Sequence, residues 1–312
     1  MIINHKNFIE KFSLEEMNGG HSGSSLYKIQ YKDNIYCIKE FNNPNMDLKV
    51  IKNICNIYEI LEIPSLELIR GSESKNSQKY AIYNYIKGAD LKTLSKEMSE
   101  SKIYEYGIKL GDYLKKIKDY SIKPTDIIPS VDINKLTAQV NKLYEQLIKN
   151  PMIKTLLEEY FTIEKIKLLI KKHNKYKFLF NKSDMHLIHG DIKMSNTMID
   201  ENGTFYLIDI ESMKLSYDVL NFRYQIIWKL MKGNEKELLF TKGMLDSLYD
   251  NTRPINFYEQ LIYVFVLNFI EHTNHISNNE EKLRDFFQNI KDVLSNLDKF
   301  NTEITDSIKY II

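Results

Sequence analysis

Three polar side chains occur in the sequence at a spacing that suits phosphoryl transfer. Asp191 and Asn196 belong to the segment His-Gly-Asp-Ile-Lys-Met-Ser-Asn of residues 189–196, and Asp209 ends the next hydrophobic segment. Phosphoryl transfer depends mainly on positioning the reactants and on neutralising the charge of the phosphates. It needs a carboxylate beside the attacking hydroxyl, and Asp191 is the candidate. Asn196 and Asp209 would supply the oxygen ligands that Mg²⁺ prefers.

These side chains need strands and turns that bring them to one place. An apolar run, residues 185–188, leads into the polar loop and predicts a strand end. The turn Asp-Glu-Asn-Gly at residues 200–203 and the hydrophobic run at 204–208 predict a β-hairpin. We expect His189 to brace the loop rather than to transfer protons. The His-x-Asp-x-x-x-x-Asn spacing matches the catalytic loop of kinases, in which a later Asp binds the metal; the alternative is ordinary turn chemistry.

A glycine- and serine-rich loop at residues 19–25 opens another predicted hairpin, formed by residues 26–31 and 35–41. Small residues in such a loop let backbone N–H groups approach phosphate oxygens. Alternation along the second strand puts Cys37 and Lys39 on the same face. Lys39 is either a solvated lysine on a half-exposed strand or a phosphate ligand. Its position between the glycine loop and the catalytic segment favours the phosphate ligand.

The motifs "HGDIKMSN" and "YLIDIE" resemble those of the aminoglycoside phosphotransferase and choline kinase family. The resemblance extends over roughly residues 17–225 and implies a protein-kinase-like, two-lobed α+β fold. A small antiparallel-sheet N-lobe, residues 1–87, would bind the nucleotide. A large helical C-lobe, residues 88–312, would carry the catalytic loop and the substrate-binding region. The resemblance also implies ATP or GTP as co-substrate and Mg²⁺ as cofactor.

The same resemblance assigns further residues to the nucleotide. Lys39 lies in the strand whose lysine contacts the α- and β-phosphates of ATP. Residues 84–86 match the hinge that binds adenine through its backbone, with Asn84 where glutamate is common. The implied site consists of catalytic Asp191, the metal ligands Asn196 and Asp209, and the nucleotide ligands Gly20, Ser22, Gly23, Ser24, Lys39, Asn84, Tyr85 and Ile86.

One helix departs from the family pattern. The helix predicted at residues 47–61 should carry a glutamate that pairs with Lys39, but its early part offers only Asp47, and Glu59 comes late. Asp47 is therefore either a shorter partner for Lys39 or an acid that caps the helix N-terminus.

The segment after the predicted metal ligand also has open interpretations. Ile210 replaces an aromatic residue of the family, and Glu211 is retained. Glu211 would line a second metal or the substrate edge, or it is simply a loop acid. Asp218, in the segment "SYDVLNF", matches a residue that braces the catalytic loop by accepting hydrogen bonds, so we expect a structural role for it.

Composition restricts the class of protein. A net charge of +1 in 312 residues favours neither nucleic acid nor an anionic membrane as a partner. Two cysteines make no disulfide framework, and no Cys/His cluster has zinc-ligand spacing. The N-terminus lacks the apolar core of a signal peptide, and the longest apolar stretch, residues 261–270, is too short to span a bilayer and predicts a buried helix. We therefore expect a cytoplasmic protein; the sequence does not indicate its oligomeric state.

Residues 91–182 and the C-terminal part are predicted to be helical. Three apolar stripes at helical spacing, beginning at Ile103, Ile133 and Ile153, predict buried helix faces rather than a cofactor site. Further helices are predicted at residues 217–231, 236–249, 257–273 and 280–297. Substrate specificity usually lies in this region of the resembling family. The acids available there to a cationic substrate are Asp246, Glu259, Glu271 and Asp285.

These observations lead to three hypotheses of function. The first is a kinase that moves the γ-phosphate of ATP or GTP to a hydroxyl of a small molecule. Family frequency favours an aminoglycoside-like antibiotic, and a choline- or sugar-type metabolite is the alternative. The second is a catalytically weak binding or assembly protein of the spore-coat type, which Asn84 and the missing helix glutamate favour and the intact catalytic set opposes. The third, a protein kinase, is disfavoured because no Ala-Pro-Glu segment follows Asp209.

Overall fold

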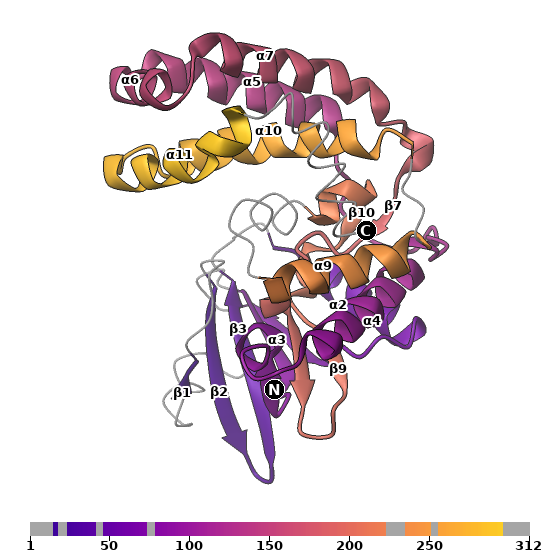
Figure 1. Cartoon of the computed structure of the whole chain (residues 1–312). Helices are drawn as coiled ribbons and strands as arrows, with labels where there is room; N and C mark the ends of the chain where they lie inside the picture. The colour runs from indigo at the N-terminus through magenta and orange to yellow at the C-terminus, as the bar shows by residue number, and fades with distance from the viewer. Residues whose placement is uncertain are drawn as a thin grey trace. The chain divides into compact units, whose positions relative to one another are not determined.

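The computed structural model describes residues 15–17, 24–41, 46–73, 79–222, 235–250 and 255–295 (Figure 1). By its contacts the chain forms two compact units. The first consists of Met1–Leu94, Ser121–Ile128 and Met194–Met213, and the second of Ser95–Tyr120, Pro129–Lys193 and Lys214–Ile312. An antiparallel sheet near the N-terminus and helices towards the C-terminus confirm the predicted α+β class. The lobe boundary that we expect near residue 88 stays a prediction.

The first unit contains a five-stranded antiparallel sheet (Figure 1). Its strands, in spatial order, are β1 (Glu15–Glu16), β2 (Ser25–Tyr31), β3 (Asn34–Phe41), β5 (Lys79–Asn84) and β4 (Leu68–Glu73). β2 and β3 form the predicted hairpin, in which Tyr31 pairs with Asn34 across a tight turn. The register places Lys39 between Leu26 on one neighbouring strand and Ala81 on the other.

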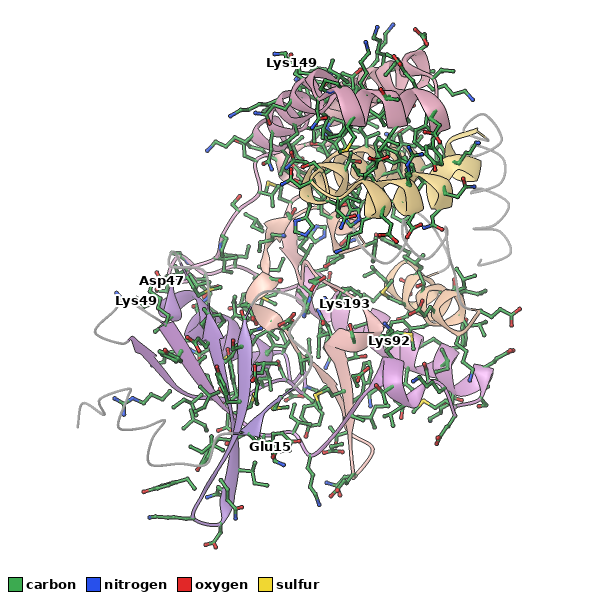
Figure 2. The ribbon with its side chains drawn as sticks, turned by 90° about the vertical axis from the view of Figure 1, so that its left-hand side faces the viewer. Glu15, Asp47, Lys49, Lys92, Lys149 and Lys193 are labelled. Atoms are coloured by element: carbon green, nitrogen blue, oxygen red, sulfur yellow. The ribbon has the colours of Figure 1, made fainter. Side chains whose placement is uncertain are left out.

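Helix α2 (Leu48–Ile60) packs on one face of this sheet, as its apolar spacing predicts. Its buried Ile51 contacts a cluster that includes Phe41 and Tyr83. Asp47 is the N-cap of α2, and its carboxylate accepts a hydrogen bond from the Lys49 N–H at 2.9 Å. Figure 2 labels both residues. Of the two interpretations of Asp47, the helix cap is therefore the one that the structure supports.

A second, three-stranded sheet in the first unit contains the segments that follow the predicted catalytic loop. It runs in the order β6 (Gly88–Asp90), β8 (Thr197–Asp200) and β9 (Phe205–Leu207), and α3 (Leu91–Leu94) follows β6. The Asp200 side chain accepts hydrogen bonds from the N–H groups of Asn202 and Thr204. Gly203 has a φ of 81°, which a glycine adopts without strain. The hairpin predicted from residues 200–208 is thus confirmed.

The second unit is mainly helical (Figure 1). Its helices are α4 (Glu100–Lys118), α5 (Ile133–Lys149), α6 (Pro151–Tyr160), α7 (Ile163–Tyr176), α9 (Glu235–Leu248), α10 (Phe257–His275) and α11 (Glu280–Ser295). Two short strands, β7 (His186–Ile188) and β10 (Lys214–Ser216), pair antiparallel. α10 packs against α5 and α7, which buries residues 261–270 as the apolar run predicts. Of the helix predicted at 217–231, residues 217–222 are described; Tyr217 is not helical and Asp218–Phe222 form a 3-10 helix.

The third predicted apolar stripe, residues 153–169, is divided between two helices rather than carried by one. Between α6 and α7, Phe161 is extended, with a φ of −138°, and its buried ring lies 5.5 Å from that of Phe287. Thr162 then caps α7 by accepting a hydrogen bond from the Lys165 N–H. A single helix is therefore wrong here, because Phe161 turns into the core and Thr162 starts a new helix.

Among the described residues, none of the helices combines the length and the apolar character that crossing a membrane requires.

His173 on α7 is fully buried against α10. Its Nδ1 lies 3.0 Å from the carbonyl oxygen of Tyr263, and the two rings stack with centroids 4.0 Å apart. Nδ1 must donate to this carbonyl, while Nε2 is buried with no hydrogen-bond partner among the described residues. Protonating Nε2 would bury an N–H without an acceptor. Burial outweighs the hydrogen bond to Tyr263 and lowers the pKa of His173 from 6.5 to about 4.

We expect His173 to lower the free energy of unfolding by about 2 kcal/mol between pH 7 and pH 5. The unfolded chain takes up a proton on this histidine below its ordinary pKa of 6.5, whereas the folded chain does not until the pH approaches 4. Stability from this group is therefore present above pH 6.5 and is lost as the pH falls. Urea unfolding of the wild type and of His173→Phe at the two pH values measures this term. An equal loss in both proteins would contradict it.

Candidate active site

Lys39 is buried in β3, although lysine side chains are usually exposed. It is 6 % exposed, and its Nζ lies 2.5 Å from a carboxylate oxygen of Asp209, 170 residues later in the chain. Lys39 also forms an ion pair with Glu211. Burial lowers the pKa of Lys39, but Glu211 and Asp209 more than offset this and raise it above its ordinary value. Lys39 is thus a charged, partnered lysine and not a solvated one.

Asp209 occupies an unusual backbone conformation at the end of the segment that contains β9. Its φ of 62° and ψ of 38° lie in the left-handed region, which Asp tolerates better than most residues. The chain turns there into a 3-10 helix, η4 (Ile210–Ser212). This tight turn lets Asp209 and Glu211 both reach Lys39.

Asn196 lies in the same unit as Asp209 and next to its strand. It ends the 3-10 helix Met194–Asn196 and is 5 % exposed. Its carbonyl oxygen accepts a hydrogen bond from the N–H of Ile208, the residue before Asp209, at 2.9 Å. The fold therefore brings Lys39, Asn196 and Asp209 into one unit.

The donor set is compatible with Mg²⁺. In the described part of the chain no three His, Cys, Asp or Glu side chains gather closely enough to hold a metal by themselves. Mg²⁺ does not need such a cage, because it is usually held by one or two protein ligands together with phosphate oxygens and water. The Asn196 amide and the Asp209 carboxylate would supply the protein share of such a shell.

The predicted hinge ends β5 and has its first two N–H groups engaged by the protein. The Asn84 N–H donates to the Glu67 carbonyl at 3.1 Å, and the Tyr85 N–H donates to the Ile35 carbonyl at 3.3 Å. The Asn84 side chain donates to the Glu67 carboxylate. Ile86 follows, and all three hinge residues line a cavity of about 240 Å³ together with the β8–β9 turn. That cavity is not lined by Lys39 or Asp209.

The predicted phosphate loop is only partly described. Gly20, Ser22 and Gly23 lie outside the described residues. Ser24 directly precedes β2, and its side chain is half-buried. The phosphate-binding role of this loop therefore stays a prediction.

Asp191 belongs to the second unit, in the loop after β7. Gly190 has a φ of 88°, so the loop needs a glycine before Asp191. The buried His189 accepts a hydrogen bond from the Asp191 N–H at its Nδ1, 3.3 Å away. This contact fits a bracing role for His189. The Asp191 carboxylate is 2.8 Å from Nζ of Lys193.

Lys193 belongs to the candidate site through its ion pair with Asp191, and our sequence analysis did not single it out. Its ammonium orients the carboxylate of Asp191 and neutralises its charge. Residues two apart do not face each other on a helix, and no periodicity indicates this pair. Only the conformation of the loop brings the two side chains together.

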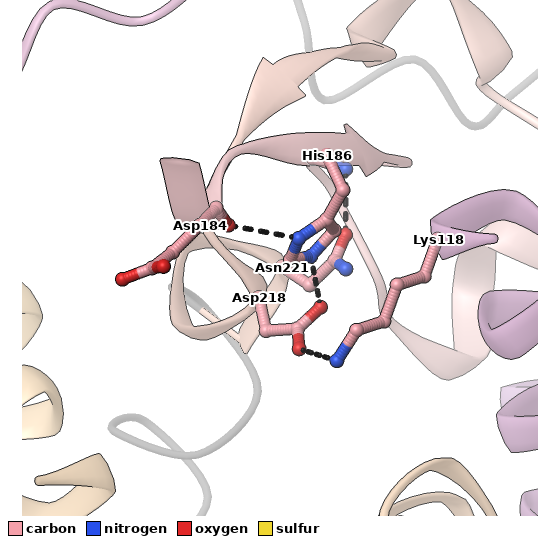
Figure 3. Close-up of polar contacts among 6 residues, drawn as sticks. Lys118, Asp184, His186, Asp218 and Asn221 are labelled. Carbon is pink, nitrogen blue, oxygen red and sulfur yellow. Dashed lines mark hydrogen bonds and ion pairs between the residues drawn. The ribbon is translucent and has the colours of Figure 1, made fainter. Parts of the chain in front are cut away.

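Figure 3 shows the polar contacts that support the predicted catalytic loop from within the second unit. Asp218 accepts hydrogen bonds from Nε2 of His186 and, at 2.6 Å, from Nζ of Lys118. Nδ1 of His186 faces the carbonyl oxygen of Asp184 at 3.0 Å. His186 is thus held at both of its ring nitrogens, by the Asp218 carboxylate and by the Asp184 carbonyl oxygen. Asn221 accepts a hydrogen bond from the Gly190 N–H at 3.0 Å.

The bracing role is thus shared between two residues. Asp218 holds the strand before the loop through His186, while Asn221 holds the loop backbone itself. Burial raises the pKa of Asp218, but His186 and Lys118 outweigh this and hold it below its ordinary value. Our sequence analysis expected Asp218 to accept hydrogen bonds that brace the loop, and the contribution of Asn221 had no signal in the sequence.

Asp218→Asn is expected to lower the free energy of unfolding by about 2–3 kcal/mol, because the half-buried Lys118 would lose its carboxylate partner and the contact with His186 would weaken. Asp184→Asn is the matched control, since the Asp184 side chain is exposed and only its backbone carbonyl contacts His186. Urea unfolding at pH 7 compares the variants. A loss in Asp218→Asn no larger than that in the control would show that these contacts do not stabilise the loop.

The C-terminal acids differ in whether they are available to a substrate. Asp246 is 6 % exposed and contacts Tyr104 at 3.0 Å and Lys242 at 2.6 Å, so it belongs to the packing of α9 against α4. Glu271 accepts a hydrogen bond from Gln139. Glu259 is half-buried, and Asp285 is exposed. Our expectation that Asp246 faces a cationic substrate is therefore wrong, because its side chain is buried.

A model of the phosphotransferase enzyme family (APH) matches residues 47–218, which is more than half of the chain. The match includes the predicted catalytic loop and Asp209. No curated protein matches the sequence.

Solved structures of phosphotransferases have a similar fold. Spectinomycin phosphotransferase APH(9)-Ia, in complex with ADP and spectinomycin, is 13% identical and has a TM-score of 0.63, covering 94% of this chain and 95% of its own. A thermostable mutant of APH(4)-Ia, with AMP-PNP and hygromycin B, is 12% identical with a TM-score of 0.64, covering 93% and 96%. The GDP complex of a mutant aminoglycoside 2'-phosphotransferase-IIIa is 10% identical with a TM-score of 0.64, covering 93% of each chain. At these identities the likeness shows the fold alone.

Proposed function

Because the chain belongs to the phosphotransferase enzyme family, we propose that it moves the γ-phosphate of ATP or GTP to a hydroxyl group of a small molecule. The observation that carries this proposal is the buried contact of Lys39 with Asp209 across 170 residues of sequence. A buried ammonium beside a carboxylate is costly to desolvate, so its presence calls for a role. Binding of a metal-bound phosphate chain is such a role.

In the proposed reaction Asp191 takes the proton of the acceptor hydroxyl. The hydroxyl oxygen forms the new bond to the γ-phosphorus, and the bond from that phosphorus to the β–γ bridging oxygen breaks. The products are the phosphorylated acceptor and ADP or GDP. Lys193 orients the Asp191 carboxylate, and Lys39 balances negative charge on the phosphates.

Mg²⁺, held by Asn196 and Asp209, would neutralise charge on the phosphates when bound. Of the hinge residues, we propose that Ile86 presents its backbone to the nucleotide base. This follows because the N–H groups of Asn84 and Tyr85 already donate to protein carbonyls.

We propose an aminoglycoside-like acceptor as the first class to test. The similar structures named above include a complex with spectinomycin and a complex with hygromycin B. These compounds are ligands of those proteins. Of the acids that we expected to face a cationic substrate, Glu259 on α10 and Asp285 on α11 remain candidates. A choline- or sugar-type metabolite is the alternative acceptor. The free cysteines, Cys37 and Cys55, fit the reducing cytoplasm that we propose as its location.

A catalytically weak assembly protein is the second candidate function. It is favoured by one observation, the absence of a buried acid on the described α2. The ion-paired Lys39 and the Lys193–Asp191 pair support the enzyme instead, because a protein without turnover would have no need of either.

The test is ADP or GDP release by the purified protein with Mg·ATP and Mg·GTP. The panel consists of aminoglycosides, choline, homoserine and sugar-like alcohols. Stimulation by one class that disappears in Asp191→Asn would support the proposal and name the acceptor. Nucleotide binding without stimulation by any compound would favour the assembly protein. No nucleotide binding would contradict the proposal.

A further inference from the structure

Lys39 has a second buried partner, Glu211, which has no role in the proposed mechanism. We propose that Glu211 is the positioning residue of Lys39, in place of an acid on helix α2. The proposal rests on the proposed function. It adds that the acid that positions the phosphate-binding lysine lies in the segment after Asp209 and not on helix α2.

Helix α2 offers Lys39 no acid. Asp47 is used at the N-cap, where it accepts a hydrogen bond from the Lys49 N–H. Glu59, in the last turn of α2, is exposed. The buried positions of α2 are Ile51, Ile54, Ile57 and Tyr58. The face of α2 that covers the sheet is therefore built for apolar packing.

Glu211 reaches Lys39 from another direction. It lies in η4, which packs against α2 within the first unit. Its side chain is 11% exposed, and one carboxylate oxygen pairs with Lys39. The other oxygen, Oε2, is buried and has no hydrogen-bond partner among the described residues. A buried carboxylate of this kind depends on Lys39 for its compensation.

The two carboxylates that contact Lys39 differ in solvent exposure, and this difference suggests a different role for each. The Asp209 side chain is 24% exposed, whereas that of Glu211 is 11% exposed. A metal ion delivered with the nucleotide would engage the more accessible Asp209 and weaken its hold on Lys39. Glu211 would then remain as the partner that keeps the ammonium pointed at the phosphates.

A double-mutant cycle between Glu211 and Lys39 tests this inference. The variants are Glu211→Gln, Lys39→Met and the double variant, with Glu59→Gln as matched control because Glu59 is the exposed acid of α2. Turnover is measured against nucleotide and against Mg²⁺, using the acceptor found above or the slow transfer to water.

We expect Glu211→Gln to lower kcat about 10- to 100-fold, with the KM for nucleotide and the half-saturating Mg²⁺ concentration changed less than about threefold. Glu59→Gln should change neither. In the Lys39→Met background, Glu211→Gln should lower kcat less than about twofold further, because a positioning residue has no effect without the group that it positions.

Three results would overturn the inference. They are unchanged kcat in Glu211→Gln, a full loss that persists in the Lys39→Met background, and a rise of about fivefold or more in the half-saturating Mg²⁺ concentration, which would make Glu211 a metal ligand. Absence of any turnover in the wild type contradicts the proposed function itself, and the inference falls with it.

Discussion

Asp191→Asn is expected to lower kcat for phosphoryl transfer about 10³-fold while nucleotide affinity stays within about twofold. The amide has the size of the carboxylate but cannot accept the proton of the acceptor hydroxyl. The loop around it is held by contacts that the substitution leaves in place, the buried His189 and the hydrogen bond from Gly190 to Asn221. The loss should therefore appear in the chemical step and not in folding or binding.

Asp184→Asn is the control for this variant, because its side chain is exposed and lies shortly before the same loop. Release of ADP under saturating substrate gives kcat, and calorimetric titration with ADP gives the affinity. If Asp191→Asn retains more than about a fifth of the wild-type rate, Asp191 does not remove the proton.

Asp209→Asn is expected to lower kcat about 10²- to 10³-fold and to raise the half-saturating Mg²⁺ concentration at least about tenfold. Asparagine is the informative replacement because it also tolerates the left-handed backbone of this position. The fold of η4 should therefore survive, so the change in Mg²⁺ dependence should come from the missing charge and not from a changed backbone.

Asp33→Asn, an exposed acid in the turn between β2 and β3, is the matched control in the same unit. Rates are measured over a series of Mg²⁺ concentrations at fixed nucleotide. A loss of rate with unchanged Mg²⁺ dependence would mean that Asp209 acts through Lys39 and not through the metal. Glu211→Gln is expected to show that pattern, so the two variants separate the two carboxylates.

Local features of the fold could be predicted because they depend on nearby residues. Alternation of side chains indicates the β2–β3 hairpin, and the Asp-Glu-Asn-Gly turn indicates the β8–β9 hairpin. Apolar spacing indicates α2 and the buried α10. The same reasoning missed the break at Phe161, where burial of one ring against a distant helix overrides the helical pattern.

Some residues of the candidate site could also be predicted from short sequence patterns. Asp191, Asn196 and Asp209 could be named from their order and spacing, because a catalytic loop and a strand-ending acid are short sequence patterns. Lys39 could be named from strand alternation together with its neighbours in the sequence. Their roles remain predictions until the variants are measured.

The sequence by itself therefore determined the family motifs, the strand and helix periods and the candidate chemistry of single residues. Only the tertiary structure decided which acid meets Lys39, that Asp47 serves as a helix cap, and that Asn221 holds Gly190. The physical reason is that a side chain's type and spacing express short-range backbone preferences. Ion pairs between segments 170 residues apart depend instead on how the chain reverses and on what the core buries.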